Sequence, residues 1–185
     1  GSIPVITGLT VYCHPCQVLA DLMTIREYKG SFKNLKLCFI GDGNNMANSL
    51  IAGCVKTGMK ISVASPSGFK PDEELVKWGE ESGLLTLTSD PFEAAENADV
   101  IYTDVWASMG QEGEAEERKK AFKSYQVNDD IMNVAKKDAI VLHCLPAHRG
   151  EEITEKVFEE HASEIFDEAE NRLHAQKAVL VKLLG

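Results

Sequence analysis

The sequence predicts an α/β protein with a doubly wound, mostly parallel sheet, flanked by helices in a Rossmann-like three-layer arrangement. Short apolar runs rich in β-branched residues alternate with longer helical stretches along the 185 residues, a pattern typical of βαβ units. The runs LKLCFI, DVIYTDV and AIVLHCL are apolar almost throughout, which favours strands that are buried on both faces. Polar segments follow these three runs, as expected where parallel strands end at a ligand site.

The predicted strands are the β-branched runs, taken in chain order. They span 35–40, 61–64, 84–88, 100–105 and 140–144, with a shorter one at 164–166. The stretches between them predict helices at 44–57, 72–81, 92–97, about 114–122, 129–136 and 151–161. Two more helices flank the set, at 17–29 and 168–184. We find neither an internal repeat nor a long linker, so residues 1–185 are expected to form one domain.

The composition is that of a water-soluble globule. With 44% hydrophobic and 26% charged residues, it argues against disorder, collagen-like repeats and disulfide scaffolds. The longest apolar stretches are far shorter than the ~20 residues of a membrane span, so no membrane contact is expected. Lys and Arg number 19 against 29 Asp and Glu, and this net charge of −10, without a basic stripe, argues against a nucleic-acid partner. The charge runs 112–120 and 151–160 are interpreted as solvated helix faces.

The cysteines suggest a compartment and an alternative function. Their odd number, five, favours a reducing cytoplasm, as does the absence of an N-x-S/T sequon and of a signal peptide at the start. Cys13 and Cys16 have the C-x-x-C spacing of dithiol oxidoreductases and precede a predicted helix, so a redox function stays open. Zinc held by these two with Cys144 and His148 is disfavoured, because no second C-x-x-C or H-x3-H pair supports it.

The segment Gly41-Asp42-Gly43-Asn44-Asn45 begins like a dinucleotide-binding turn. The third glycine position holds Met46, and the second predicted strand runs into Ser65 with no acidic residue for a ribose hydroxyl. A non-catalytic nucleotide-binding module is therefore a second alternative. The turn also places Asn45 at a helix N-terminus, where it is suited to an anionic group such as a carboxylate.

Three further residues have both a structural and a functional interpretation. Asp104, at the end of an apolar strand, caps a turn or binds an ammonium group in a crevice. Cys144 is a small packing residue or a member of the site. Arg172 forms a weak surface ion pair with its acidic neighbours or binds an anion.

Taken together, five ordered motifs resemble the ornithine carbamoyltransferase family. They are HPCQ at 14–17, GDGNN-M at 41–46, TDVW-SMG at 103–110, HCLPAHRG at 143–150 and FDEAENRLHAQKA at 166–178. The likeness runs from about Pro4 to Leu184. Aspartate carbamoyltransferases share the HP-x-Q opening, but Cys144-Leu145 and Ser108-Met109 point to ornithine as the acceptor.

The resemblance implies transfer of a carbamoyl group from carbamoyl phosphate to the δ-amino group of ornithine, giving citrulline and phosphate with no metal or organic cofactor. It implies catalytic roles for His14, Asp104, Cys144 and Arg172. The implied ornithine-binding residues are Asn45, Asp104, Ser108 and Met109. Those implied for carbamoyl phosphate are His14, Gln17, Cys144, Leu145 and Arg172.

One departure from the family concerns phosphate. The Ser-x-Arg-Thr-type loop with which the family grips phosphate has no match among these residues. We therefore expect the ornithine-binding domain alone, with an interdomain helix at 17–29, a closing helix at 169–184 and the carbamoyl-phosphate domain absent. The expected full-length enzyme is a trimer-based homo-oligomer of arginine metabolism, and the chain by itself is expected to be inactive.

Overall fold

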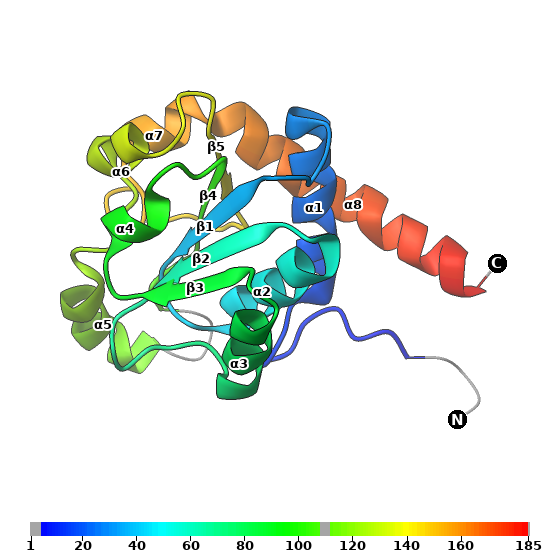
Figure 1. Cartoon of the computed structure of the whole chain (residues 1–185), viewed down its shortest axis with the longest axis horizontal. Helices are drawn as coiled ribbons and strands as arrows, with labels where there is room; N and C mark the ends of the chain where they lie inside the picture. The colour runs from blue at the N-terminus through cyan, green and yellow to red at the C-terminus, as the bar shows by residue number, and fades with distance from the viewer. Residues whose placement is uncertain (1–4, 108–111, 185) are drawn as a thin grey trace.

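A computed structural model of the chain describes residues 5–107 and 112–184. Five parallel strands form one sheet in the order β3-β2-β1-β4-β5 (Figure 1). Their bounds are β1 Lys36–Ile40, β2 Lys60–Ala64, β3 Leu85–Thr88, β4 Val100–Thr103 and β5 Ile140–His143. The order reverses between β1 and β4, because the chain first winds outward through β2 and β3 and then returns to the other side of β1.

Helices cover both faces of this sheet and bury two apolar clusters. The helices are α1 Pro15–Lys29, α2 Asn45–Thr57, α3 Glu73–Glu81, α4 Pro91–Ala95, α5 Ala115–Phe122, α6 Asp129–Val134, α7 Glu155–Glu160 and α8 Ala162–Leu184, with a 3-10 turn η1 at Glu112–Glu114. On one face α1 and α2 pack on strand residues such as Phe39 and Tyr102. On the other, α4 to α7 pack on alternate strand residues such as Cys38 and Ile40. The predicted three-layer α/β fold is confirmed.

The turn from β1 into α2 is built by two residues with distinct tasks. Asn44 caps α2, its side-chain oxygen accepting from the backbone N–H groups of Met46 and Ala47. Gly43 passes so close to the backbone of Lys70 and Pro71 that a β-carbon would overlap with it. Its N–H also donates to the Phe69 carbonyl at 2.8 Å, which ties this turn to the segment after β2.

The predicted strand at 164–166 is wrong, because these residues lie in the first turns of α8. Ile165 is buried there together with Glu168, Asn171 and Ala175, a spacing of three and four residues that belongs to a helix. The helix predicted at 151–161 begins at Glu155, because Thr154 caps it by accepting from Val157 N. The helix predicted at 17–29 starts two residues earlier, at Pro15, a residue favoured in a first helical turn.

The two charge runs are only partly solvated, which corrects the sequence interpretation. Arg118 of the first run is buried, and its Nη1 lies 2.7 Å from Asp42 Oδ2. Glu152 of the second run is fully buried and faces His143. Periodicity alone does not reveal such residues, because their partners lie outside the helical spacing of three or four residues. Asp42 is 76 residues from Arg118, and His143 is nine residues from Glu152.

The long helix α8 packs along α1 and then continues past the body of the molecule (Figure 1). Exposed apolar side chains lie mostly on its second half: Leu173, Leu180, Val181, Leu183 and Leu184. Within residues 5–107 and 112–184, the helices are all too short or too polar to cross a membrane.

Candidate active site

The segments that follow β1, β4 and β5 meet at the carboxyl edge of the sheet, next to the reversal of strand order. Asp104 lies at their junction and is almost fully buried. Its Oδ1 accepts from Val105 N at 2.8 Å and from the Cys144 thiol at 3.1 Å, and its Oδ2 accepts from Asn44 Nδ2 at 2.8 Å. The structure thus joins the three segments through one carboxylate. Among the described residues, three donors occupy three of its roughly four acceptor positions, so one position remains for a further donor.

Cys144 is a neutral thiol. Burial raises its pKa well above the ordinary value, and the charge of Asp104 and the hydrogen bond to it raise this pKa further. The thiol therefore donates its proton to Asp104 rather than serving as a thiolate nucleophile. The chemistry open to Cys144 is orientation of the carboxylate and acceptance of a weak hydrogen bond at sulfur.

Two buried side chains, those of His143 and Glu152, form hydrogen bonds that fix the turn after β5. Leu145, at a φ of 54°, donates its N–H to His143 Nδ1 at 2.9 Å. Since Nδ1 accepts, the proton of the neutral ring is on Nε2, which lies 3.1 Å from Glu152 Oε1. The same Glu152 oxygen accepts from His148 N. The backbone of Cys144 and Leu145 is therefore fixed by side chains that do not themselves reach the site.

Asn45, which sequence reasoning assigned to the ornithine carboxylate, turns toward the segment before α1. Its Nδ2 donates to the Thr10 carbonyl at 2.8 Å. Its backbone carbonyl accepts from Ser49 Oγ at 2.7 Å, and that hydroxyl accepts from His14 N at the same distance. The start of α2 is in this way tied to the HPCQ segment.

His14 is half-buried at the N-terminus of α1. Its Nδ1 lies 2.9 Å from the Gly8 carbonyl, which can only accept, so Nδ1 carries a proton. Burial lowers the pKa of His14, and the positive charge of Arg172 lowers it further. In the neutral ring Nε2 is thus an acceptor, and only the imidazolium form donates from it.

Gln17 lies one helical turn further along α1 and is buried. Its Nε2 donates to Asp21 Oδ1 at 2.9 Å and to Glu168 Oε1 at 3.0 Å. Its Oε1 accepts from Arg172 Nη1 at 2.6 Å. Glu168 also accepts from Tyr102 Oη and from His143 N, so it links α1, α8, β4 and β5. The structural interpretation of Arg172 as a surface ion-pair residue is therefore wrong, because its guanidinium bonds to the buried Gln17.

Two residues predicted for the site, Ser108 and Met109, lie outside the described residues. Four of the others form two hydrogen-bonded pairs, whereas the Asn45 side chain bonds to Thr10 and the Leu145 N–H to His143. Asp104 and Cys144 are directly joined, as are Gln17 and Arg172, and the Arg172 charge acts on His14. Glu168 joins the two pairs through the backbone N–H of His143, the residue before Cys144.

Sequence reasoning missed Asp21, Asn44 and Glu168. Asn44 has a signal, since Asn is a preferred N-cap and is the first residue of the helix predicted at 44–57. Asp21 also has one, because it lies four residues after Gln17 and thus on the same face of the predicted helix. Glu168 pairs with a residue 151 positions away, a separation that no local pattern reports.

One cluster of metal-ligating types lies near the site. Ligand atoms of His148, Glu151 and Glu152 come within 4.8 Å of one another. Glu151 Oε1 already pairs with Lys119 Nζ at 2.8 Å, and Glu152 Oε1 with His143. The charges that would attract a cation are thus partly neutralised by the protein itself. Cys13 and Cys16 are free thiols, and Cys16 is buried in the first turn of α1.

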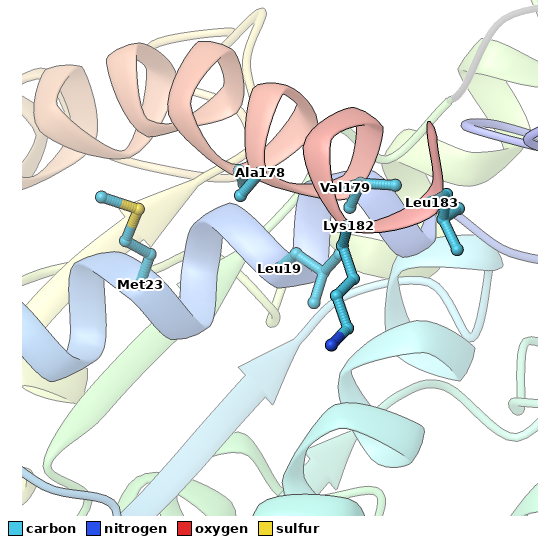
Figure 2. Close-up of a pocket in the computed structure, with 7 residues that line it drawn as sticks. Leu19, Met23, Ala178, Val179, Lys182 and Leu183 are labelled. Carbon is cyan, nitrogen blue, oxygen red and sulfur yellow. The ribbon is translucent and has the colours of Figure 1, made fainter. Parts of the chain in front are cut away.

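Two largely apolar pockets lie along α1, and the second borders Ser49, which accepts from His14 N. One, of about 450 Å³, is formed between α1 and the second half of α8 (Figure 2), with the lining residues Leu19, Met23, Ala175, Ala178, Val179, Lys182 and Leu183. The other, of about 460 Å³, lies beside α1 and α2, with Val18, Leu22, Ala52 and Gly53 in its wall. The first is lined by aliphatic side chains apart from Lys182, whereas the lining of the second also includes Cys13, Asn48, Ser49, Lys56 and Thr57.

Comparison with known proteins gives a single family. Residues 33–183 match the model of the aspartate/ornithine carbamoyltransferase Asp/Orn binding domain. The whole chain is 57% identical to the ornithine carbamoyltransferase of Archaeoglobus fulgidus and 56% identical to that of Pyrococcus abyssi, and it covers 61% and 60% of their lengths. The chain thus spans about three fifths of these curated relatives.

Solved structures of ornithine carbamoyltransferases share the fold of this chain. The ornithine carbamoyltransferase from Pyrococcus furiosus superposes with a TM-score of 0.89 at 54% identity, over 97% of this chain and 59% of that one. The enzyme from Gloeobacter violaceus superposes with a TM-score of 0.91 at 53% identity, over 100% of this chain and 63% of that one.

Proposed function

The chain belongs to the aspartate/ornithine carbamoyltransferase family, and on that premise we propose that it is the ornithine-binding part of an ornithine carbamoyltransferase. In this reaction the δ-amino nitrogen attacks the carbonyl carbon of carbamoyl phosphate. The C–N bond of citrulline forms, the C–O bond to phosphate breaks, and the amine loses a proton. The single observation that carries the proposal is the buried Asp104 carboxylate, joined to Cys144 and Asn44 at the carboxyl edge of the sheet.

Asp104 is suited to the α-ammonium group of an amino acid. The three donors that it has within residues 5–107 and 112–184 leave about one acceptor position, and a buried carboxylate gains most when a cation fills it. Asn45 supports the carboxylate end of the same ligand. Its amide has two N–H groups, and the bond to Thr10 uses only one of them. Ser108 and Met109 complete the proposed ornithine contacts.

The acceptor amine must lose its proton before it attacks. An alkyl ammonium of the Lys type has a pKa near 10.4, so deprotonation at pH 7 costs about 4–5 kcal/mol. Desolvation in the site lowers this cost because it disfavours the charged form. The neutral Cys144 thiol supports an orienting role at sulfur, since it holds Asp104 and adds no negative charge that would stabilise the ammonium.

Gln17, Arg172 and His14 support the carbamoyl side of the site. Gln17 Oε1 faces Arg172, and its second lone pair is available to accept from the carbamoyl NH2 group. Arg172 supplies fixed positive charge for the carbonyl and phosphate oxygens, on which negative charge develops. His14 polarises the carbonyl only as an imidazolium, or after its Nδ1 proton moves to Nε2, because Gly8 engages the present proton. The backbone carbonyl of Leu145 is proposed to meet both substrates.

The proposal extends beyond these residues. A second domain would supply the loop that grips phosphate, α1 over 17–29 would bridge the domains, and α8 over 169–184 would close onto the second one. The pocket between α1 and α8 in Figure 2 supports that packing, because an aliphatic surface at the end of α8 is otherwise left to solvent.

We propose a cytoplasmic, trimer-based enzyme of arginine metabolism that uses no metal or organic cofactor. The comparisons do not favour a dithiol oxidoreductase or a nucleotide-binding module.

Binding of bisubstrate analogues tests the proposal. We expect the chain to bind a phosphonoacetyl group joined to the δ-nitrogen of ornithine more tightly than the same group joined to the nitrogen of aspartate, as measured by calorimetric titration. Asp104→Asn should weaken the ornithine analogue at least tenfold, because it removes the charge facing the ammonium. The exposed Asp130→Asn is the matched control. Equal affinity for both analogues, or an unchanged affinity in the Asp104 variant, would refute the assignment.

A further inference from the structure

Two carboxyl groups, Asp21 on α1 and Glu168 on α8, lie together in the buried layer beneath Gln17. Both are 0% exposed. One nitrogen, Gln17 Nε2, donates to both, at 2.9 Å to Asp21 Oδ1 and 3.0 Å to Glu168 Oε1. Two buried carboxylates this close repel each other strongly, so the pair is expected to retain one proton at neutral pH.

The donors around the pair show which carboxyl holds that proton. Glu168 accepts from Gln17 Nε2, from Tyr102 Oη at 3.0 Å and from His143 N at 2.8 Å. Asp21 accepts from Gln17 on Oδ1, whereas its buried Oδ2 has no hydrogen-bond partner, neither donor nor acceptor, among the described residues. A carboxyl surrounded by donors is stabilised as the anion, and one whose oxygen has no donor is suited to carry the proton. The proton therefore belongs on Asp21, whose Oδ1 lies beside Glu168 Oε1 on the same Gln17 nitrogen.

The electrostatic environment agrees with this assignment. Burial raises the pKa of Asp21 well above its ordinary value, and the charge of Glu168 and the hydrogen bond to it raise this pKa further. Burial also raises the pKa of Glu168, but hydrogen bonds from Asp21, His143 N and Tyr102 lower it. The other titratable or charged groups that face the pair come from several elements: Tyr102 on β4, His143 on β5, Cys54 on α2, Cys144 after β5 and Arg172 on α8.

We propose that Asp21 and Glu168 share a single proton, held on Asp21, and act as positioning residues that fix the carboxamide oxygen of Gln17 toward Arg172. The amide nitrogen must face the two carboxyl groups, because a carboxamide oxygen there would meet two acceptors. The same orientation gives Arg172 an acceptor instead of an opposing N–H group. Neither carboxyl touches the reacting atoms in this arrangement.

The consequence for the reaction rests on the proposed function. With its oxygen held outward, Gln17 offers an acceptor to an acyl group that bears N–H donors, as a carbamoyl group does. A site built to hydrogen-bond a substrate N–H discriminates strongly against an analogue that lacks it, such as an acetyl group. Asp21 and Glu168 would thus control acyl-group specificity through Gln17.

Two isosteric variants separate this proposal from a merely structural role. Asp21→Asn resembles the protonated acid, since its Oδ1 can still accept from Gln17 and it carries no negative charge. Glu168→Gln introduces an N–H group that faces the donors of Tyr102, His143 and Gln17. We therefore expect Asp21→Asn to preserve the orientation of Gln17 and Glu168→Gln to disturb it. Glu170→Gln, at an exposed position on the same helix, is the matched control.

Two spectra of the intact chain read the outcome. The first is the nitrogen–proton NMR signal of the Gln17 side-chain amide, which is assigned by its loss in Gln17→Met. Its chemical shift should stay unchanged in Asp21→Asn and in the control variant Glu170→Gln. It should change in Glu168→Gln. In infrared spectra at pH 7, the C=O band of a buried protonated carboxyl should be present in the parent chain and absent in Asp21→Asn. A missing band in the parent, or equal displacement of the Gln17 signal in both carboxyl variants, would overturn the proposal.

The pH dependence of folding gives a third readout. An acid whose pKa is raised in the folded state stabilises fully below its unfolded value, near 3.9 for Asp, and loses this contribution as pH rises through the folded value. Asp21→Asn should therefore gain stability relative to the parent as pH is raised, measured by urea unfolding. Parallel pH profiles would count against the shared proton. These readouts need no ornithine and no turnover, so they succeed or fail independently of the analogue-binding test.

Discussion

At the residue scale, the site depends on charges that are buried but paired. Asp42, directly after β1, is an example. Burial raises its pKa, and the adjacent Arg118 guanidinium counteracts that rise. Arg118 Nη1 also donates to the Trp106 carbonyl at 3.1 Å, and its guanidinium lies 4.9 Å from the centre of the Phe69 ring. One arginine from α5 thus neutralises the turn after β1 and holds the segment after β4.

Removing this arginine should be costly. We expect Arg118→Met to lower the free energy of unfolding by about 3 kcal/mol at pH 7, because it leaves the Asp42 carboxylate buried without its cation. The loss should be smaller at pH 5, where Asp42, with its raised pKa, takes up a proton more readily. Urea unfolding at both pH values measures this.

The matched control is Lys156→Met, which removes a solvent-exposed pair with Asp129 and should cost less than about 1 kcal/mol. Adding Asp42→Asn to Arg118→Met should recover part of the loss, since the second change removes the orphaned charge. Equal costs for the buried and the exposed pair would show that burial of Asp42 is not the cause.

At the element scale, the turns decide which side chains reach the carboxyl edge of the sheet. The passage from β1 to α2 needs a residue without a β-carbon at Gly43 and a cap at Asn44. The Asn44 side chain also donates to Asp104, so one amide group positions both the start of α2 and the end of β4. A shift of this turn would therefore move two functional segments together.

Gly43→Ala tests the tightness of that turn. The added methyl would overlap with the backbone of Lys70 and Pro71, which cannot rotate away as a side chain can. We expect a loss of about 3 kcal/mol in unfolding free energy, at the upper end of overpacking costs. Gly68→Ala, at a position with open space around the would-be β-carbon, should change stability by less than about 1 kcal/mol. Similar values for the two variants would contradict the close approach.

The elements were largely predictable, and the reasons are local. Five parallel strands follow from apolar β-branched runs, and the convergence of Asp104 and Cys144 follows from the polarity of parallel strands. The segment 164–166 was misassigned because three residues are too few to separate a strand from a helical turn. The pairing of Gln17 with Glu168 was not predictable, since it depends on how α8 lies against α1.

At the scale of the whole molecule, α8 is buried unevenly along its length. Its first half is anchored by buried Ile165, Glu168, Asn171 and Ala175, whereas most side chains of its last turns are exposed. Local stability follows buried contacts, so the two halves should open with different free energies.

Hydrogen exchange should report this difference. We expect the amides of residues 176–184 to exchange faster than those of 165–175 in the folded chain. Correspondingly, Leu180→Ala should change the free energy of unfolding by less than about 0.5 kcal/mol, whereas Ile165→Ala should cost about 3 kcal/mol because it opens a cavity in the core. Uniform protection along the helix would refute the division.

The geometry of α8 has a mechanical consequence. A helix of 23 residues is a stiff rod about 34 Å long. Glu168 lies in the first half of that rod and Arg172 at its middle, whereas the exposed aliphatic side chains lie mostly toward the C-terminal end. A partner that binds the exposed C-terminal end would therefore act on a rigid helix that carries the Arg172 guanidinium at its middle, so a small rotation of the helix would re-aim that positive charge without any contact with it.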